Sequence, residues 1–141
     1  MRYILDANVG LKWVLPEVDS AKALRLRADM QAGVHELLAP DVFPVEVAHA
    51  LARAERKGTI PIGDADVHLL NILSTSPQLK PSLAILRRAL AISSAARIGV
   101  YDCVYVALAE REACQLVTAD DKLVKNLQAQ FPFIVPLASL P

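Results

Sequence analysis

The chain carries no excess charge of either sign, since fifteen Lys and Arg residues balance fifteen Asp and Glu residues. This excludes a protein that binds nucleic acid through a strongly positive overall charge, so any hold on phosphate must come from local groups or a bound metal ion. Cysteine is scarce too: Cys103 and Cys114 lie eleven positions apart in a stretch with a helical pattern, about 16 Å at about 1.5 Å per residue, which is beyond disulfide reach. We therefore expect a reduced, cytoplasmic protein.

Long apolar runs are also missing. Met1-Arg2 leads directly to Tyr3-Ile4-Leu5-Asp6, and the longest uncharged stretch, residues 126–141, is interrupted by glutamine and proline. We expect neither a secretory signal nor a membrane span. Hydrophobic residues nevertheless make up 54% of the 141 residues, which excludes a disordered chain and supplies a core for a single domain over residues 1–141.

Several catalytic motifs are absent as well. The sequence has no GxxxxGK[ST] phosphate loop, no GxSxG nucleophile turn, no HExxH zinc motif and no CxxC pair. Its three histidines, His35, His49 and His68, are scattered without zinc-ligand spacing. The candidate functional groups are therefore carboxylates.

Short β-type runs alternate with longer helical patterns, which predicts an α/β fold with a mainly parallel sheet. We expect strands at 3–5, 37–39, 115–118 and 133–135, and helices at 9–15, 21–32, 41–58, 62–73, 83–96, 102–113 and 121–130.

Two acids follow predicted strands. Asp6 comes directly after the first strand and Asp120 after the strand at 115–118. Ligands of open parallel sheets bind beyond the carboxyl ends of strands, so both acids could face a cation. The structural alternative is helix capping: Asp6 could cap the first helix, and Thr118 with Asp121 fits a capping box that leaves Asp120 free.

Two further acids belong to predicted helices. Asp102 stands where a helix begins at the same sheet edge, and capping is the alternative role for it. Glu46 lies inside a helix and cannot cap it. His49, Arg53 and Lys57 follow Glu46 along one side, so this side is either a solvated stripe or a path from a cleft along an RNA backbone.

The four acids converge on one edge of the predicted sheet. Clustered carboxylates repel one another, which raises their pKa values and makes the cluster unstable without a cation. Their hard oxygen atoms suit Mg²⁺ or Mn²⁺.

With these residues in place, the chain resembles the PIN-domain ribonucleases, specifically the small VapC-type toxins of toxin–antitoxin pairs. The resemblance runs nearly end to end and rests on four segments in order: Leu5-Asp6-Ala7-Asn8-Val9-Gly10-Leu11-Lys12-Trp13, Pro44-Val45-Glu46-Val47-Ala48, Tyr101-Asp102-Cys103-Val104-Tyr105-Val106-Ala107-Leu108-Ala109-Glu110 and Val117-Thr118-Ala119-Asp120-Asp121-Lys122-Leu123. Tyr101, beside Asp102, is interpreted as a packing residue.

The resemblance implies a Rossmann-like three-layer sandwich, with a short sheet between helices, and metal-dependent cleavage of RNA to 5′-phosphate and 3′-hydroxyl ends. By position, the catalytic and metal-binding acids are Asp6, Glu46, Asp102 and Asp120, with Mg²⁺ or Mn²⁺ as the cofactor. Supporting positions are Asn8, Thr118, Asp121 and His49, the last replacing an asparagine common in the family. Arg53, Arg56 and Lys57 are candidates for RNA contact. The implied partners are an antitoxin and a second copy in a homodimer.

Two alternatives stay open at this point. A haloacid-dehalogenase-like phosphatase also has an Asp after its first strand, but it needs a second Asp two residues on, where this chain has Asn8. A non-catalytic RNA-binding or interaction module could keep the fold without turnover.

Overall fold

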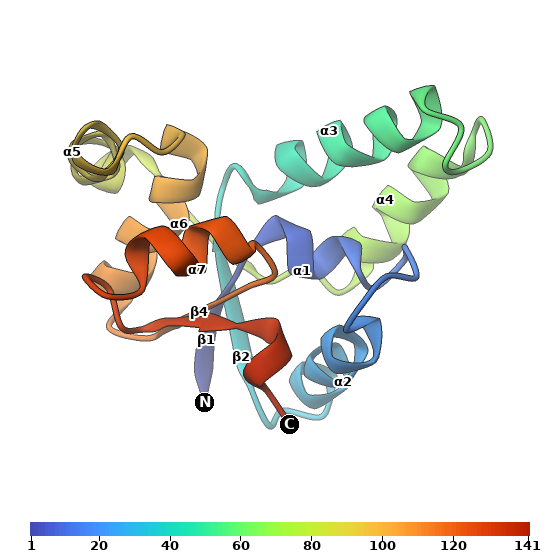
Figure 1. Cartoon of the computed structure of the whole chain (residues 1–141). Coiled ribbons are helices and arrows are strands. Elements are labelled where there is room, and N and C mark those ends of the chain that lie inside the picture. Colours follow the sequence, from blue (N-terminus) through green and yellow to red (C-terminus); the bar gives the residue numbers. More distant parts are fainter.

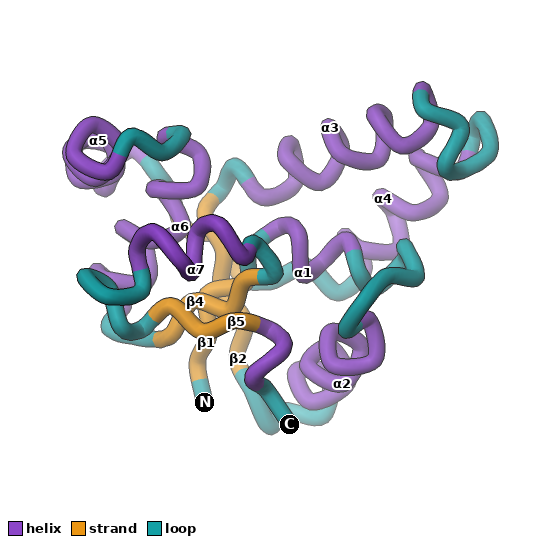
Figure 2. The backbone as a smooth tube through the Cα atoms, in the orientation of Figure 1, coloured by secondary structure: helices purple, strands orange, loops and turns teal.

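The computed structural model describes residues 1–141, whose strands form one parallel sheet in the order β3-β2-β1-β4-β5. All four strand pairings are parallel, which confirms the predicted α/β architecture. Figure 2 shows the strands gathered at the centre with the helices around them. The bounds of the strands are β1 (Arg2–Leu5), β2 (Glu36–Pro40), β3 (Gln78–Lys80), β4 (Gln115–Thr118) and β5 (Ile134–Pro136).

Helices cover both sides of this sheet and make a three-layer arrangement. Figure 1 shows α1 and α2 on one side of the central strands and α5 and α6 on the other. The α-helices are α1 (Ala7–Leu11), α2 (Ser20–Gln31), α3 (Phe43–Arg56), α4 (Asp64–Ser74), α5 (Leu86–Ala96), α6 (Val100–Glu112) and α7 (Asp121–Leu127), with short 3₁₀ turns η1 (Leu83–Ile85) and η2 (Leu137–Ser139). None of them has both the length and the apolar character that a membrane crossing requires.

The core is one cluster of 33 buried residues centred on β1, β4 and α6. Seven consecutive residues of α6, Cys103 to Ala109, are buried, because this helix packs against β1 and β2 and against the neighbouring α5. Main-chain pairing aligns Leu5 of β1 with Val117 of β4, and the amide of Asp6 extends the ladder to the Val117 carbonyl at 3.0 Å. The ends of these two strands are therefore held side by side.

Several element boundaries differ from those predicted. The strand β3 was missed, because this short edge strand is largely exposed and has no apolar alternation. Helix α1 starts at once after Asp6 rather than at residue 9, and α6 starts at Val100 rather than at Asp102. The predicted helix at 83–96 is split into η1 and α5.

Candidate active site

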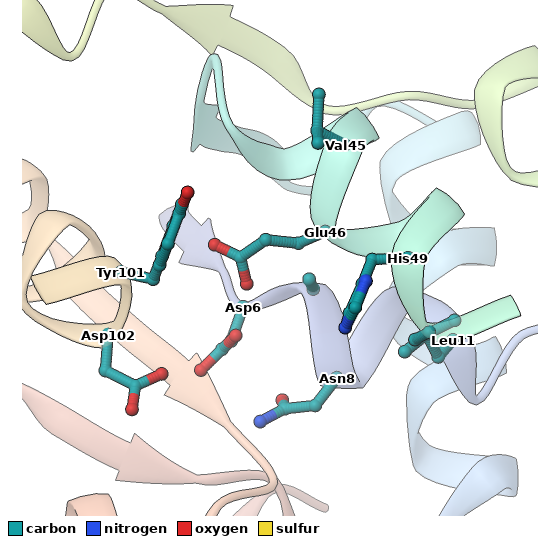
Figure 3. Close-up of a pocket in the computed structure, with 10 residues that line it drawn as sticks. Asp6, Asn8, Leu11, Val45, Glu46, His49, Tyr101 and Asp102 are labelled. Atoms are coloured by element: carbon teal, nitrogen blue, oxygen red, sulfur yellow. The ribbon is translucent and has the colours of Figure 1, made fainter. Parts of the chain in front are cut away.

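A cavity of about 480 Å³ opens at the carboxyl end of β1, between α1, α3 and the start of α6. Figure 3 shows carboxylates from three different elements turned toward this space. The cavity is lined by Asp6, Ala7, Asn8, Leu11, Val45, Glu46, His49, Ala50, Tyr101 and Asp102. Three of the four acids predicted from the sequence therefore share one cavity wall.

Asp6 forms the floor of the site and is only 4% exposed. It stands at the N-cap position of α1, but its side chain makes no capping hydrogen bond. Instead, its Oδ2 accepts a hydrogen bond of 2.9 Å from the hydroxyl of Thr118. Burial, aided by the nearby charges of Asp102 and Asp120 and opposed by the Thr118 bond, raises the pKa of Asp6 to about 7. The capping alternative thus does not describe this side chain.

Thr118 and Asn8 join the two strand ends through a small network. The Thr118 oxygen accepts the Asp120 amide at 3.1 Å and the Asn8 amide group at 3.4 Å, while Asn8 Oδ1 accepts the Ala119 amide at 3.0 Å. Both the nitrogen and the oxygen of the Asn8 side-chain amide are therefore hydrogen-bonded within the protein. Asn8 also cannot donate a proton as the second Asp of a phosphatase would, so no observation favours that alternative.

Asp120, and not the predicted pair of Thr118 and Asp121, caps α7. Its Oδ1 accepts the amides of Lys122 and Leu123 at 2.9 and 3.2 Å. The predicted capping box is wrong because the Thr118 oxygen accepts the amides of Asp120 and Asn8 and not that of Asp121, and because α7 begins one residue after Asp120. Asp120 does not line the cavity, yet its negative charge raises the pKa values of Asp6 and Asp102.

Glu46 enters the cavity from the first turn of α3. Its Oε1 is buried and has no hydrogen-bond partner in the chain, which is incompatible with a solvated surface stripe. Burial, with repulsion from Asp6 and Asp102, raises the pKa of Glu46 to about 8. An acceptor oxygen left without a donor in such a place fits a ligand that the protein itself does not supply.

Asp102 is half-buried in the first turn of α6, opposite Glu46 in Figure 3. The N-cap of this helix is Gly99, so Asp102 is not the cap that its sequence position suggested. Burial and the charge of Asp120 raise the pKa of Asp102 above its usual value. Three carboxylates from different segments of the chain therefore bring negative charge to one site.

The remaining predicted residues divide into two groups. Asn8 and His49 line the cavity. Asp121 is exposed and borders a separate cavity of about 250 Å³. The basic side chains proposed for RNA contact are exposed at the C-terminal end of α3, outside the cavity of the acids, and form no ion pairs: Arg53, Arg56 and Lys57.

Two tyrosines were misjudged or missed in the sequence. Tyr101 is 62% exposed at the mouth of the cavity, so its interpretation as a packing residue is wrong. Tyr105 was not singled out, although it stands three residues after Asp102 and therefore on the same side of α6. Its hydroxyl is buried without a hydrogen-bond partner in the chain.

The donor set fits a hard divalent cation in chemistry and position. Three carboxylates with raised pKa values share the cavity. A bound cation would relieve the repulsion between their negative charges. As the side chains stand, no three Asp, Glu, His or Cys groups are close enough to enclose one ion. Ligation therefore requires side-chain rotation or intervening water, which Mg²⁺ commonly keeps in its coordination shell.

Comparison with known proteins agrees with this geometry. The model of the PIN domain family matches residues 3–127. The chain belongs to the PIN-domain family. A curated relative, Ribonuclease VapC3 of Pyrobaculum aerophilum, is 30% identical over 131 residues, which cover 92% of this chain and 97% of the relative. The chain is thus a homologue of the VapC ribonucleases, and divalent-metal dependence is general among PIN-domain ribonucleases.

Solved structures share the PIN fold. A crystal structure of a Pyrobaculum aerophilum protein superposes with a TM-score of 0.72 at 20% identity, covering 99% of this chain and 94% of the other. VapBC2 from Rickettsia felis, bound to a promoter DNA fragment, gives 0.64 at 17% identity, and a toxin–antitoxin complex from Klebsiella pneumoniae gives 0.65 at 16%; each covers 96% of this chain and 97% of the matched chain. At these identities the likeness establishes the fold.

Proposed function

We propose that this PIN-domain protein is a divalent-metal-dependent endoribonuclease and the toxin of a toxin–antitoxin pair, acting in the cytoplasm as a single catalytic domain over residues 1–141. The observation that carries the proposal is the convergence of Asp6, Glu46 and Asp102 on one cavity, where their pKa values are raised and a buried Glu46 oxygen has no donor. The homology to VapC ribonucleases supplies the substrate class.

In this proposal Asp6 and Asp102 hold Mg²⁺ or Mn²⁺, and Glu46 and Asp120 bind it directly or through water. The cation, when bound, supplies charge to polarise the scissile phosphate and lowers the pKa of a water molecule for in-line attack. Thr118 fixes the orientation of Asp6 by its 2.9 Å hydrogen bond. Asn8 fixes the loop after β4 by accepting the Ala119 amide, and Asp120 fixes the start of α7 by accepting the amides of Lys122 and Leu123.

The surface around the cavity suggests how RNA lies on the protein. The exposed ring of Tyr101 at the cavity mouth offers a face for stacking an unpaired base. His49 lines the cavity, and Arg53 and Lys57 continue along α3 away from it. We propose that these cations, with Arg56, contact phosphates beyond the scissile one, since a neutral chain needs local positive charge to hold RNA.

We also propose an antitoxin partner and a homodimer. Two structural relatives are VapBC2 and a toxin–antitoxin complex, which supports the first partner. Exposed apolar side chains on two separate helices support further protein contacts: Val67 and Leu70 on α4, and Leu86 and Leu90 on α5. Light scattering of the purified chain, alone and with the product of the adjacent gene, measures both assemblies.

Cleavage of structured RNA in Mg²⁺ or Mn²⁺ tests the function directly. We expect cleavage that EDTA stops, and that Asp6→Asn and Asp102→Asn abolish while their unfolding midpoints stay within a few degrees of wild type. Asp66→Asn, on the exposed side of α4, is the matched control and should cleave normally. Cleavage that persists in EDTA, or fast hydrolysis of small phosphate esters with intact RNA, would reject the proposal.

A further inference from the structure

Two side-chain polar atoms of the whole chain are buried without a hydrogen-bond partner: Oε1 of Glu46 and the hydroxyl of Tyr105. One is an acceptor and the other can donate. The charges of Asp6 and Asp102 raise the pKa values of both groups, and Ala7, whose amide lies near the phenol oxygen, lines the same cavity as Glu46. The unsatisfied donor and the unsatisfied acceptor thus belong to the same part of the molecule.

The buried hydroxyl of Tyr105 lowers the stability of the fold, and packing of the ring does not require it. The residue is fully buried in the middle of α6, where the ring of a phenylalanine would fill the same space. A buried hydroxyl without a partner is destabilising, so the oxygen has no structural benefit in the metal-free protein. Burial, followed by the charges of Asp6 and Glu46, raises the pKa of Tyr105 far above its usual value, so the hydroxyl retains its proton and acts as a donor.

The other groups near Tyr105 are less suitable acceptors. Oδ2 of Asp6 already accepts the Thr118 hydroxyl. Neither Oδ1 of Asp6 nor a carboxylate oxygen of Asp102, the third acid whose charge acts on Tyr105, is buried without a partner. The Ala7 amide also lies near the phenol oxygen and favours its ionised form, although it forms no hydrogen bond of normal geometry; an N–H group there cannot accept the phenol proton. Glu46 alone combines negative charge with an oxygen that is buried and free.

We propose that Tyr105 is a positioning residue, whose hydroxyl donates a hydrogen bond to the ionised Glu46 carboxylate, directly or through one water, and so fixes which carboxylate oxygen faces the metal ion. This inference rests on the proposed function and adds a residue to its site. Tyr105 touches neither the metal nor the RNA; it acts through Glu46.

Removal of the single oxygen tests the proposal in Tyr105→Phe. We expect the metal-free variant to unfold at the wild-type temperature or higher, because the unsatisfied hydroxyl is gone. Its affinity for Mn²⁺ alone, measured by calorimetry without RNA, should fall about tenfold, the loss expected for a hydrogen bond to a charged group. The kcat for RNA cleavage should fall by a similar factor, with KM unchanged.

Two further variants separate positioning from packing. In a Glu46→Gln background, Tyr105→Phe should change Mn²⁺ affinity less than twofold, because the carboxylate through which Tyr105 acts is absent. Tyr3→Phe is the matched control: Tyr3 is also a buried tyrosine, but its hydroxyl lies against the Met1 sulfur at 3.5 Å, at the opposite end of β1. This control should leave Mn²⁺ affinity unchanged.

The outcomes distinguish this inference from the function on which it rests. If wild type binds Mn²⁺ and cleaves RNA while Tyr105→Phe binds Mn²⁺ equally well, the inference is overturned and the function stands. An equal loss of affinity in the Glu46→Gln background, or a lowered unfolding temperature in Tyr105→Phe, shows a packing defect and also overturns it. If wild type neither binds Mn²⁺ nor cleaves RNA, both the function and the inference fail.

Discussion

The hydroxyl of Thr118 donates a hydrogen bond to Oδ2 of Asp6 at 2.9 Å, although 112 positions separate the two residues in the chain. The contact exists because β1 and β4 are neighbours in the sheet and end at the same level. It keeps the central carboxylate in one orientation and favours its ionised form. Thr118 therefore lowers the pKa of Asp6, against the larger effect of burial, which raises it.

Replacement of this hydroxyl by a methyl group should affect both stability and pH dependence. In Thr118→Val, the Asp120 amide and the Asn8 amide group also lose their acceptor, so the free energy of unfolding should fall by about 1–3 kcal/mol. Because the Thr118 bond lowers the pKa of Asp6, the acid limb of the pH–cleavage profile should move to higher pH. Thr118→Ser should restore both; an unshifted profile in Thr118→Val would contradict this role.

Without metal, the protein should lose stability as the pH rises from about 5 to 8. Asp6 and Glu46 have folded pKa values of about 7 and about 8, above their ordinary values of 3.8 and 4.5. In this window the folded state holds protons that the unfolded state releases, so the free energy of unfolding falls with increasing pH, by up to about 1.4 kcal/mol per pH unit for each of the two groups. Urea unfolding in EDTA at several pH values measures the loss.

A double variant and added metal provide the controls for this pH effect. Asp6→Asn combined with Glu46→Gln removes the two buried acids and should flatten the decline between pH 5 and 8. Millimolar Mn²⁺ at pH 8 should return stability to wild type but not to the double variant, since a cation stabilises only the protein that binds it. If the free energy of unfolding fell equally between pH 5 and 8 in wild type and in the double variant, other titrating groups would be the cause.

Asp120 combines a structural and a chemical role that two substitutions separate. Asn caps helices about as well as Asp, so Asp120→Asn should keep the capping bonds to α7 and the unfolding temperature while it reduces cleavage. Asp120→Ala should lose cleavage and in addition about 1 kcal/mol of stability. Thermal unfolding and cleavage assays of the two variants give the comparison, and normal cleavage by Asp120→Asn would remove Asp120 from the metal site.

Gly10 permits the close approach of α1 to α3, and thus of Asp6 to Glu46. A Cβ atom at Gly10 would stand 3.0 Å from Cζ of the fully buried Phe43. Gly10→Ala should cost about 1–3 kcal/mol of stability through this overpacking and should reduce cleavage by shifting α3. Addition of Phe43→Leu should cost less in the Gly10→Ala background than in wild type, as a double-mutant cycle by urea unfolding would show. Additive costs would exclude this contact as the cause.

The cations of α3 should contribute to RNA affinity and not to the chemical step. Arg53→Gln with Lys57→Gln should raise KM for RNA and leave kcat unchanged, because both side chains lie outside the cavity. The slope of log affinity against log salt concentration should become about 1.4 less negative, which corresponds to the loss of two phosphate contacts with single-stranded RNA. Lys125→Gln, on exposed α7, is the control. A reduced kcat would place these residues nearer the reacting phosphate than we propose.

The sequence pattern singles out the acids of the cavity, because each stands either at the end of a strand or in a helix, where its position can be compared with a capping role. Asp6 follows an apolar strand, and Glu46 lies inside an amphipathic helix, where no capping role explains it. The parallel sheet then brings these boundaries to one edge, which is a consequence of topology alone. The structure adds that burial, more than mutual repulsion, is the largest cause of the raised pKa values.

The remaining contacts depend on long-range pairing that no local pattern contains. Thr118 with Asp121 fits a capping box by spacing, but the Thr118 oxygen accepts the amides of Asp120 and Asn8, and Asp120 caps α7 instead. Tyr105 belongs to a run of buried α6 residues and is typical of a core position, so its free hydroxyl is apparent only in three dimensions. The strand β3 was missed because an exposed edge strand lacks periodicity.

The register of β1 against β4 has a consequence for the history of such chains. Leu5 faces Val117 through main-chain bonds that almost any side chains would permit. The part of the reactive centre that contains Asp6 and Thr118 is thereby anchored to the backbone of two adjacent strands, and side chains elsewhere in these strands can diverge over many generations without displacing it. A designer could transplant the centre intact, provided that the paired strand ends travel together with the first turns of α3 and α6, which carry Glu46 and Asp102.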